Sequence, residues 1–515
     1  MSRKRMQRPA RQTRRRRDAE AQCLLEFCQP ACRGESAWDE RNAANPATRL
    51  ATNPATCHTP SPKGAKGNSP GQRRGNSAKQ NPSRVEAAEE SELPEGWQMR
   101  PLGDCLALIR NGLTATQNRG GIGHPVTRIE TISEDRINPQ KVGYVAEATE
   151  EQVGRYAMQT GDILFSHINS EPQLGRTAIY ESVNQRLLHG MNLLLLRANE
   201  CMDPWFLHYQ CQQLRSRGVF IGLAARAVGQ SSINQGKLKT LGIAKPPLPE
   251  QRAIAAVLRT VQRAKEACEQ VLAATRQLKA SLLHHLFTYG PVPFAQADRV
   301  ELQETEIGPA PSSWPTKRFD DFVTLQRGQD LRREDFEDGT VPVIGATSII
   351  GFHREANVKG PGVTVVRSGS SAGKPLFINR DFWAHNVVLY VKDFHGNDVK
   401  FVYHKLGMLD LTRFRAGVAV PTLNRNTFSG IMVDVPPLSE QREIARQLAA
   451  VDAKLVALEM RRAALASLFA SLLHHLMTGQ VRLPAAMRAG AAQGGLPEFP
   501  NAKAPRRAVT PEAPA

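Results

Sequence analysis

Apolar residues recur every seven positions in two long stretches of this chain, with polar residues at most positions between them. Such a heptad pattern predicts a long helix whose apolar side packs against another helix. In the second stretch the repeat is regular, and its apolar positions are Ile444, Leu448, Val451, Leu455, Leu458, Leu465, Phe469, Leu472 and Leu476. In the first stretch lysines interrupt the repeat, and its apolar positions are Ile254, Leu258, Val261, Cys268, Leu272, Leu282 and Leu286.

The two stretches are copies of one another. The first opens with Pro246-Pro-Leu-Pro-Glu-Gln-Arg252 and the second with Pro436-Pro-Leu-Ser-Glu-Gln-Arg442, an offset of 436 − 246 = 190 residues. The same offset relates Ser281-Leu-Leu-His-His-Leu286 to Ser471-Leu-Leu-His-His-Leu476. The copies align without a gap over about 45 residues, of which roughly half are identical, so the chain consists of two homologous halves.

The flanking residues place the helices at 246–290 and 436–480. Prolines before each stretch cannot continue a helix backwards, Ser439 is a suitable N-cap, and Gly290 and Gly479 follow the expected ends. A lone helix with such an apolar stripe would expose it to water, so we expect the two copies to pair antiparallel as a coiled coil. A parallel pair, or pairing with a helix of another protein, is open on the sequence alone.

A globular segment followed by a helix that opens Pro-Pro-Leu-x-Glu-Gln-Arg, with the same pair repeated, resembles the specificity subunit of type I restriction-modification systems. The resemblance covers about residues 91–480. It implies two target-recognition domains, each reading half of a bipartite double-stranded DNA target, and a helix spacer that docks two modification subunits. It also implies that restriction subunits join the complex, and that S-adenosylmethionine, ATP and magnesium are bound by those partner subunits and not by this chain.

Short strand-like runs alternate with Gly- and Asn-rich turns before each helix, which predicts mixed α/β domains and an α+β fold for the chain. In outline the two domains repeat each other, since Gly161-Asp-Ile-Leu-Phe165 corresponds in order to Gly362-Val-Thr-Val-Val366. The predicted order along the chain is a basic disordered extension (1–90), the first recognition domain (91–245), the first helix (246–290), a linker (291–304), the second recognition domain (305–435), the second helix (436–480) and a disordered tail (481–515).

Polar side chains in the loops of both domains are candidates for reading bases. Arginine can bind guanine through two hydrogen bonds, asparagine and glutamine can do the same with adenine, and serine or threonine adapts to either. In the first domain the candidates are Gln117, Asn118, Arg119, His167, Asn169, Gln230, Ser231, Ser232 and Asn234. In the second they are Arg327, Gln329, Arg367, Ser370, Ser371, Lys374, Thr422, Asn424 and Arg425.

The repeated helices carry the residues to which the resemblance assigns spacing and subunit docking. In the first helix these are Glu250, Gln251, Arg252, Ile254, Leu258, Val261 and Leu282. In the second they are Glu440, Gln441, Arg442, Ile444, Leu448, Val451 and Leu472.

The net charge of +18 is concentrated at the N-terminus. Residues 1–84 contain 18 Lys+Arg and 6 Asp+Glu, which gives +12 and leaves +6 for the remainder. This segment is rich in Arg, Pro, Asn and Ser and has no sustained periodicity, so we predict that it is disordered. The sequence has neither a signal-peptide pattern nor an apolar stretch that could span a membrane, and a low cysteine content favours a cytoplasmic protein.

Metal and nucleotide sites fit the sequence poorly. Cys23, Cys28, Cys32, Cys57 and His58 lack the paired spacing of a structural zinc site. The run from Gly369 to Lys374 is one residue too short for a phosphate-binding loop, and Pro375 replaces the Ser or Thr that would hold magnesium.

Catalytic motifs are also missing from the sequence. It contains no Asn/Asp-Pro-Pro-aromatic tetrapeptide of adenine methyltransferases, no acidic nuclease motif and no helicase motif. We therefore expect a non-catalytic DNA-reading scaffold. The alternatives are a duplicated coiled-coil adaptor for proteins, without sequence-specific DNA reading, and a catalytic protein with unfamiliar motifs.

Overall fold

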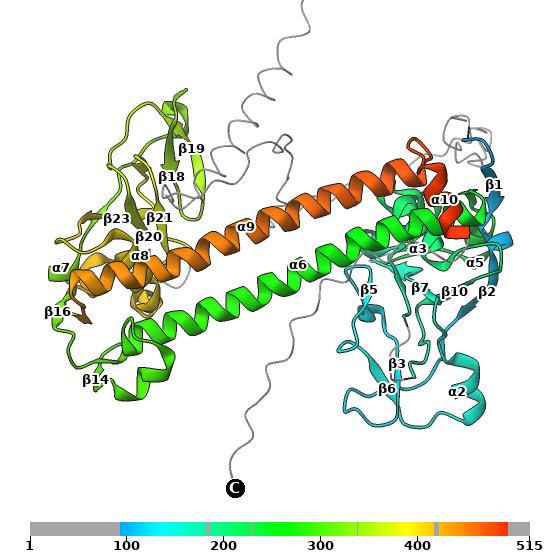
Figure 1. Cartoon of the computed structure of the whole chain (residues 1–515), viewed down its shortest axis with the longest axis horizontal. Coiled ribbons are helices and arrows are strands. Elements are labelled where there is room, and N and C mark those ends of the chain that lie inside the picture. The colour runs from blue at the N-terminus through cyan, green and yellow to red at the C-terminus, as the bar shows by residue number, and fades with distance from the viewer. Residues whose placement is uncertain (1–92, 182–185, 228–229, 337, 417–421, 493–515) are drawn as a thin grey trace, which may run out of the picture. The chain divides into compact units, whose positions relative to one another are not determined.

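The computed structural model describes residues 93–181, 186–227, 230–336, 338–416 and 422–492. These residues fall into two compact units, the N-terminal unit (93–266 with 463–492) and the C-terminal unit (267–462). Each unit holds one mixed α/β domain and a segment of each long helix, α6 (Leu248–Tyr289) and α9 (Leu438–Met477) (Figure 1). The predicted extension at 1–90 and the residues after 492 lie outside the described part.

The N-terminal unit is built on an antiparallel sheet with strand order β2-β10-β7-β9. These strands are β2 (Leu106–Asn111), β10 (Leu194–Ala198), β7 (Ile163–Phe165) and β9 (Thr177–Ile179). Leu194, Leu195 and Leu196 are all fully buried, because β10 and β7 have apolar cores on both faces. An unbroken apolar run is the sequence pattern of such a strand. Helix α3 (Pro204–Ser216) packs against this sheet, since Phe206 and Leu207 share a core with Ile163 and Phe165.

Shorter elements complete this domain. A first pair is β1 (Gln98–Pro101) with β13 (Gly242–Lys245), next to the 3-10 turn Leu102–Cys105. Further described elements are β3 (His124–Val126), β4 (Ile132–Ser133), β5 (Arg136–Ile137), β6 (Gly143–Val145), α2 (Glu150–Tyr156), β8 (Ile168–Asn169), α4 (Val219–Leu223), β11 (Ala225–Ala227), β12 (Gln230–Ser232) and α5 (Gln235–Lys239).

The domain of the C-terminal unit repeats this plan. Its antiparallel sheet has the order β17-β23-β20-β21, formed by β17 (Thr324–Arg327), β23 (Val388–Asp393), β20 (Gly362–Val366) and β21 (Pro375–Ile378). Because β20 and β7 hold the same place in the two sheets, the correspondence of the two segments is confirmed, although the strand pairing aligns Phe165 with Val365 and not with Val366.

The remaining described elements of the C-terminal unit surround this sheet. They are the 3-10 helix Phe294–Arg299, β14 (Leu302–Thr305), β15 (Gly308–Pro311), β16 (Thr316–Arg318), α7 (Phe319–Phe322), β18 (Val341–Ile344), β19 (Ile349–His353), β22 (Trp383–Ala384), α8 (Val399–Met408), β24 (Arg415–Ala416), β25 (Thr422–Leu423) and β26 (Met432–Asp434).

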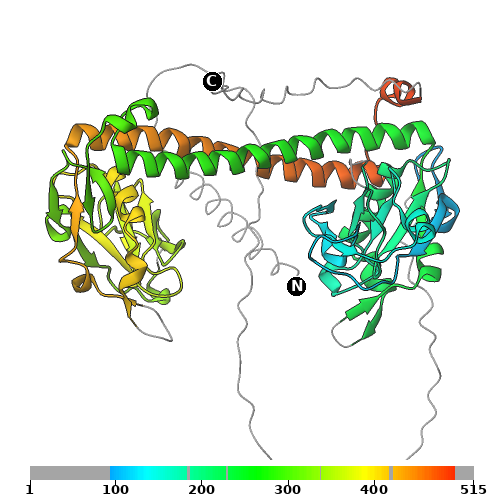
Figure 2. The same ribbon diagram turned by 90° about the horizontal axis from the view of Figure 1, so that it is seen from below.

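Within each unit the segments of α6 and α9 lie side by side and run antiparallel (Figures 1 and 2). In the C-terminal unit, Cys268 contacts Leu458 while Lys279, further along α6, pairs with Asp452, which comes earlier in α9. In the N-terminal unit, Ile254 and Leu258 share a core with Leu476. The predicted antiparallel pairing is confirmed, and each pair of helix segments also forms part of the core of its domain.

The helix ends follow the sequence signals with one exception. Gly290 directly follows α6 and Gly479 lies two residues after the end of α9, with φ of 78° and 70°, a conformation that favours glycine at a C-terminal cap. The prediction that Ser439 caps α9 is wrong, because the helix already begins at Leu438. The carbonyl of Pro437 accepts the first helical hydrogen bonds, from the backbone N–H groups of Glu440 and Gln441, both at 3.0 Å.

The C-terminal tail begins later than the sequence indicated. Residues 485–492 form α10 (Ala485–Ala492), and Leu483 packs against the core of the N-terminal unit. Arg482 reaches back to Glu250 at the start of α6. Among the described residues, no helix combines the length and apolar character that spanning a bilayer requires.

Candidate nucleic-acid interface

In the first domain, several of the candidate residues gather around one open hollow. β12 pairs with β8, which places Ser231 opposite Asn169, and the backbone N–H of Ile233 donates to the carbonyl of His167 at 2.8 Å. The lining of the hollow includes Asn111, His167, Ser232, Asn234, Gln235 and Lys237. Figure 2 shows the hairpin of β11 and β12 projecting from its domain on the side away from α6 and α9.

The side chains around the hollow differ in their freedom to bind a ligand. Gln230 and Ser232 are exposed, whereas Ser231 between them is buried and faces the domain. Asn234 caps α5, and its Oδ1 accepts from the backbone N–H of Gly236 at 2.6 Å, which leaves its amide nitrogen available. Burial lowers the pKa of His167, so this imidazole is neutral near pH 7.

The candidates Gln117, Asn118 and Arg119 lie in a different loop. Asn118 exchanges backbone hydrogen bonds with Tyr144 at 2.8 and 2.9 Å, and its side-chain amide donates to the carbonyl of Ile122 at 2.9 Å. These contacts close the loop, so Asn118 has a structural role. Arg119 is 80% exposed and lies 3.7 Å from Glu130, a weak surface pair that leaves it able to contact phosphate.

In the second domain, the loop between β20 and β21 and the strand β25 bring candidates together. The backbone N–H of Leu423 donates to the carbonyl of Arg367 at 2.8 Å, and Ser368 forms a β-bridge with Thr422. The loop closes where the backbone N–H of Val366 donates to the carbonyl of Lys374 at 2.9 Å. Ser370 and Lys374 are exposed within this loop, and Ser371 is half-buried.

The other candidates of the second domain stand around the same end of its sheet. Arg327 is exposed at the end of β17. Gln329 pairs with His385, and its side-chain oxygen is 3.5 Å from the amide of Asn357. Arg425 donates to the carbonyl of Leu325 at 3.1 Å, so it partly serves the fold, and Asn424 caps a 3-10 turn.

The two candidate surfaces are built in the same way. The hydrogen bond from Ile233 to His167 matches that from Leu423 to Arg367, with the same length of 2.8 Å. Asn234 and Asn424 each cap the helical turn that follows, at the same 190-residue offset as the long helices. The equivalence inferred for the segments before the helices therefore extends to hydrogen bonds, while the side chains differ.

The repeated Gln of the helix-opening motif closes each domain onto its helix. The side-chain oxygen of Gln251 accepts from the backbone N–H of Asp203 at 2.8 Å, and its amide donates to the carbonyl of Pro246 at 2.8 Å. Gln441 makes the matching bonds to Asp398 and Pro436, both at 2.9 Å. Both side chains are buried, so they are not available to dock another subunit.

The residues on either side of this Gln differ in their exposure to solvent. Glu250 is buried and paired with Arg482 at 2.7 Å, and Glu440 accepts from the indole N–H of Trp314 at 2.9 Å. Arg252 and Arg442 are exposed. The apolar positions Ile254, Leu258, Ile444 and Leu448 are buried, and Val261, Leu282, Val451 and Leu472 are half-buried. Within the motif, the exposed positions available for docking therefore include the two arginines, together with Pro247, Pro437, Leu438 and Ser439.

The sequence model of the type I restriction modification DNA specificity domain matches this chain twice, at residues 94–274 and 311–465. Together the two matches cover more than half of the chain. The chain belongs to this family. Each match contains one domain and the first part of the long helix that follows it.

Individual members of the family give the same result. The chain is 31% identical over 435 residues to the putative type I restriction enzyme MjaX specificity subunit of Methanocaldococcus jannaschii, covering 77% of this chain and 96% of that protein. It is 25% identical over 151 residues to the type I restriction enzyme EcoKI specificity subunit of Escherichia coli, covering 29% of this chain and 32% of that protein.

A solved structure of the family shares the fold. The crystal structure of a type I restriction-modification S subunit from M. genitalium superimposes with a TM-score of 0.56 at 18% identity. The superposition covers 75% of this chain and 96% of that one.

For a member of the specificity-domain family, the remaining motifs have structural roles. The run from Gly369 to Lys374 leads into strand β21, whereas a phosphate-binding loop must open a helix. The Nε2–H of His285 donates to the carbonyl of Val292 at 2.7 Å and the ring stacks on Phe294, while His474 contacts Gln213. Within the described residues no group of His, Cys, Asp and Glu could hold a metal, and the cysteines at 23–57 lie outside them.

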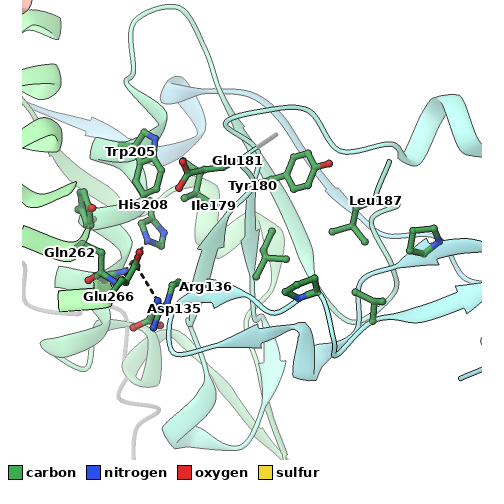
Figure 3. Close-up of a pocket in the computed structure, with 16 residues that line it drawn as sticks. Asp135, Arg136, Ile179, Tyr180, Glu181, Leu187, Trp205, His208, Gln262 and Glu266 are labelled. Atoms are coloured by element: carbon green, nitrogen blue, oxygen red, sulfur yellow. Dashed lines mark hydrogen bonds and ion pairs between the residues drawn. The ribbon is translucent and has the colours of Figure 1, made fainter. Parts of the chain in front are cut away.

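A second cavity, of about 240 Å³, lies where the first domain packs against α6 (Figure 3). Trp205 and His208 of α3 line it, together with Arg136, which pairs with Glu266 of α6 at 3.2 Å. Burial lowers the pKa of His208 to about 3, so the imidazole is neutral. Because this cavity borders the helix, it belongs to the attachment of the domain to its spacer.

Sequence reasoning missed Asn111 and Lys237, which line the hollow of the first domain. Asn111 ends a strand and precedes Gly112, just as Arg327 ends a strand and precedes Gly328. A polar residue before glycine at the end of a core strand in both halves was the signal that could have identified it.

Proposed function

We propose that this chain is the DNA-recognition subunit of a type I restriction-modification complex, and that each domain reads one half of a bipartite target. The observation that carries this proposal is the repetition of one scaffold with different exposed polar residues. Two half-sites of different sequence require such an arrangement. Contacts from surface arginines and lysines to phosphates would set the register of each domain, and contacts to base edges would supply specificity.

The partner subunits follow from the duplication. A chain with two equivalent docking surfaces can bind two copies of one modification subunit, even though the chain itself is asymmetric. We assign this docking to the repeated helix segments, with Arg252 and Arg442 at equivalent exposed positions. The chain would act in the cytoplasm without catalysing a reaction. S-adenosylmethionine on the modification subunits would supply the methyl group for an adenine that has been flipped out of the duplex, and restriction subunits would use ATP and magnesium.

The decisive test is sequencing of adenine methylation in DNA from cells that express this chain with its modification partner. Cells that lack only this chain are the control. We expect a bipartite methylated motif that depends on the chain. Exchange of residues 91–245 for those of another family member should change one half of the motif and leave the other half intact.

A second test addresses the spacing of the half-sites. Four residues inserted into each helix, after Glu266 and after Arg462, add about one turn and roughly 6 Å of rise to each. We expect the gap in the methylated motif to widen by about two base pairs, given a spacing of about 3.4 Å per step. An unchanged gap, with methylation retained, contradicts a spacer role for the helices.

The rival proposal is a coiled-coil adaptor that binds proteins without reading DNA. It predicts a complex with the modification subunit whose DNA binding is insensitive to sequence, and no methylated motif that depends on this chain. The methylation experiment therefore separates the two proposals.

A further inference from the structure

Asn111 and Arg327 occupy equivalent positions in the two recognition domains. Asn111 pairs with Leu194, which pairs on its other side with Phe165. Arg327 pairs with Leu389, which pairs on its other side with Val365. Both residues therefore end an outer strand beside the same central strand.

The glycine that follows each position confirms the match. A Cβ on Gly112 would lie 1.9 Å from the carbonyl oxygen of Gly190, and a Cβ on Gly328 would lie 2.2 Å from that of His385. The chain therefore leaves the sheet along the same path in both domains, and the preceding side chain starts from the same place.

A neighbouring pair of equivalent positions is also uncharged in the first domain and positively charged in the second. His167 and Arg367 hold equivalent places, because their carbonyls accept the matching hydrogen bonds from Ile233 and Leu423. Burial keeps the His167 imidazole neutral by lowering its pKa, whereas a guanidinium is always charged. The next equivalent pair, Arg176 and Lys374, is basic in both domains.

The environment of each side chain suits a different base. Asn111 is exposed and lines the hollow together with the amides of Asn234 and Gln235. Arg327 is exposed, and its side chain forms neither a hydrogen bond nor an ion pair with any other described residue. Two cationic residues, Arg327 and Arg367, stand at the sheet end of the second domain where the first domain has uncharged ones.

We propose that Asn111 and Arg327 are equivalent specificity determinants, through which the first domain selects an adenine and the second domain a guanine. The side-chain amide of asparagine donates from its nitrogen to N7 of adenine and accepts at its oxygen from N6, and a guanidinium donates two hydrogen bonds to O6 and N7 of guanine. This inference rests on the proposed function, since it requires each domain to read one half-site.

The test uses the full chain assembled with its modification subunits and a DNA pool in which both half-sites are randomised. Arg327→Asn should replace a preferred guanine by adenine at one position of the half-site read by residues 305–435. Arg327→Lys keeps the charge but lacks the planar fork, so it should keep overall affinity and lose about 5-fold to about 140-fold of the discrimination for guanine. Asn111→Arg should shift one position of the other half-site from adenine to guanine.

Arg318→Asn is the matched control, because Arg318 is exposed on β16, the strand paired with β26 next to α9. It should leave the selected motif unchanged. Uniform weakening of all sequences by Arg327→Asn and no change with Arg327→Lys would make Arg327 a phosphate contact and overturn the proposal. The proposal would also be overturned if the half-site read by the second domain contains no guanine. If the unsubstituted complex selects no bipartite motif, the proposed function itself fails, and this inference fails with it.

Discussion

The first turns of helices α6 and α9 both contain a glutamate followed by a glutamine, but only the glutamine makes the same contacts in both. Gln251 and Gln441 make matching bonds to the N-cap residue of the domain's main helix and to the proline carbonyl before their own helix. The neighbouring acids differ, because Glu250 pairs with Arg482 and Glu440 with the indole of Trp314. A contact that closes a domain onto its helix is thus kept in both halves.

The interiors of the two domains differ more strongly. In the second domain, Lys405 of α8 and Asp434 of β26 form a buried ion pair at 2.6 Å. Gln210 of the first domain is equivalent to Lys405, because each lies seven residues after the N-cap of its helix, α3 or α8. Ala244 is equivalent to Asp434, because each lies two residues before the first proline of the helix-opening motif. The same scaffold therefore contains a buried charge pair in one copy and none at the equivalent place in the other.

Breaking this ion pair should have the largest effect. Lys405→Gln leaves the Asp434 carboxylate buried without its partner, and we expect a loss of about 3–5 kcal/mol in the unfolding free energy of the C-terminal unit. Adding Asp434→Ala installs the pair found in the first domain and should recover most of the loss. Amide hydrogen exchange of β23 and α8 measures the change locally. A double variant as unstable as the single one would show that the loss has another cause.

Lowering the pH should destabilise the N-terminal unit more than the C-terminal unit, with a smaller effect than the loss of the ion pair. Burial lowers the pKa of His189 to about 4 and of His208 to about 3 in the N-terminal unit, and of His404 to about 3 in the C-terminal unit. Since the unfolded chain binds these protons near pH 6.5, stability is full above that pH and falls as the pH drops toward the folded values. Each histidine contributes about 1.4 kcal/mol per pH unit in that window.

We therefore expect the N-terminal unit, in which burial also lowers the pKa of His167, to lose stability more steeply than the C-terminal unit between roughly pH 6 and 5. Asp135, whose pKa is raised by burial, acts in the opposite direction and makes that slope shallower. Hydrogen exchange in β10 and β23 over this range reports each unit separately. His208→Tyr, which introduces the residue found at the equivalent Tyr403, should reduce the slope of the N-terminal unit, and equal slopes before and after would contradict the assignment.

The sequence predicted those features that repeat over many residues. Heptads and the constant offset identified α6 and α9, because burial along a whole element leaves a periodic pattern. Features that depend on one hydrogen bond were less accessible. The sequence favours Ser439 as the N-cap of α9, although the carbonyl of Pro437 accepts the first helical hydrogen bonds. It also favours Asn118 as a base contact, because a polar loop residue has the same sequence signature whether it binds DNA or closes its own loop.

The smallest expected effect concerns Trp97 and Trp314, which precede β1 and β16 and are equivalent, because their backbone N–H groups donate to the carbonyls of Pro94 and Pro311 at the same distance of 2.9 Å. The indole N–H of Trp314 donates to Glu440, whereas that of Trp97 is buried without a partner among the described residues, because Glu250 is taken by Arg482. Replacement by phenylalanine removes similar packing from both, but only Trp314→Phe also deprives a carboxylate of its donor. We expect Trp314→Phe to cost about 1–2 kcal/mol more than Trp97→Phe, measured by hydrogen exchange in β16 and β1. In a Glu440→Ala background that difference should disappear. If it persists, the two tryptophans differ in packing, and the different partners of Glu250 and Glu440 have no energetic consequence at these sites.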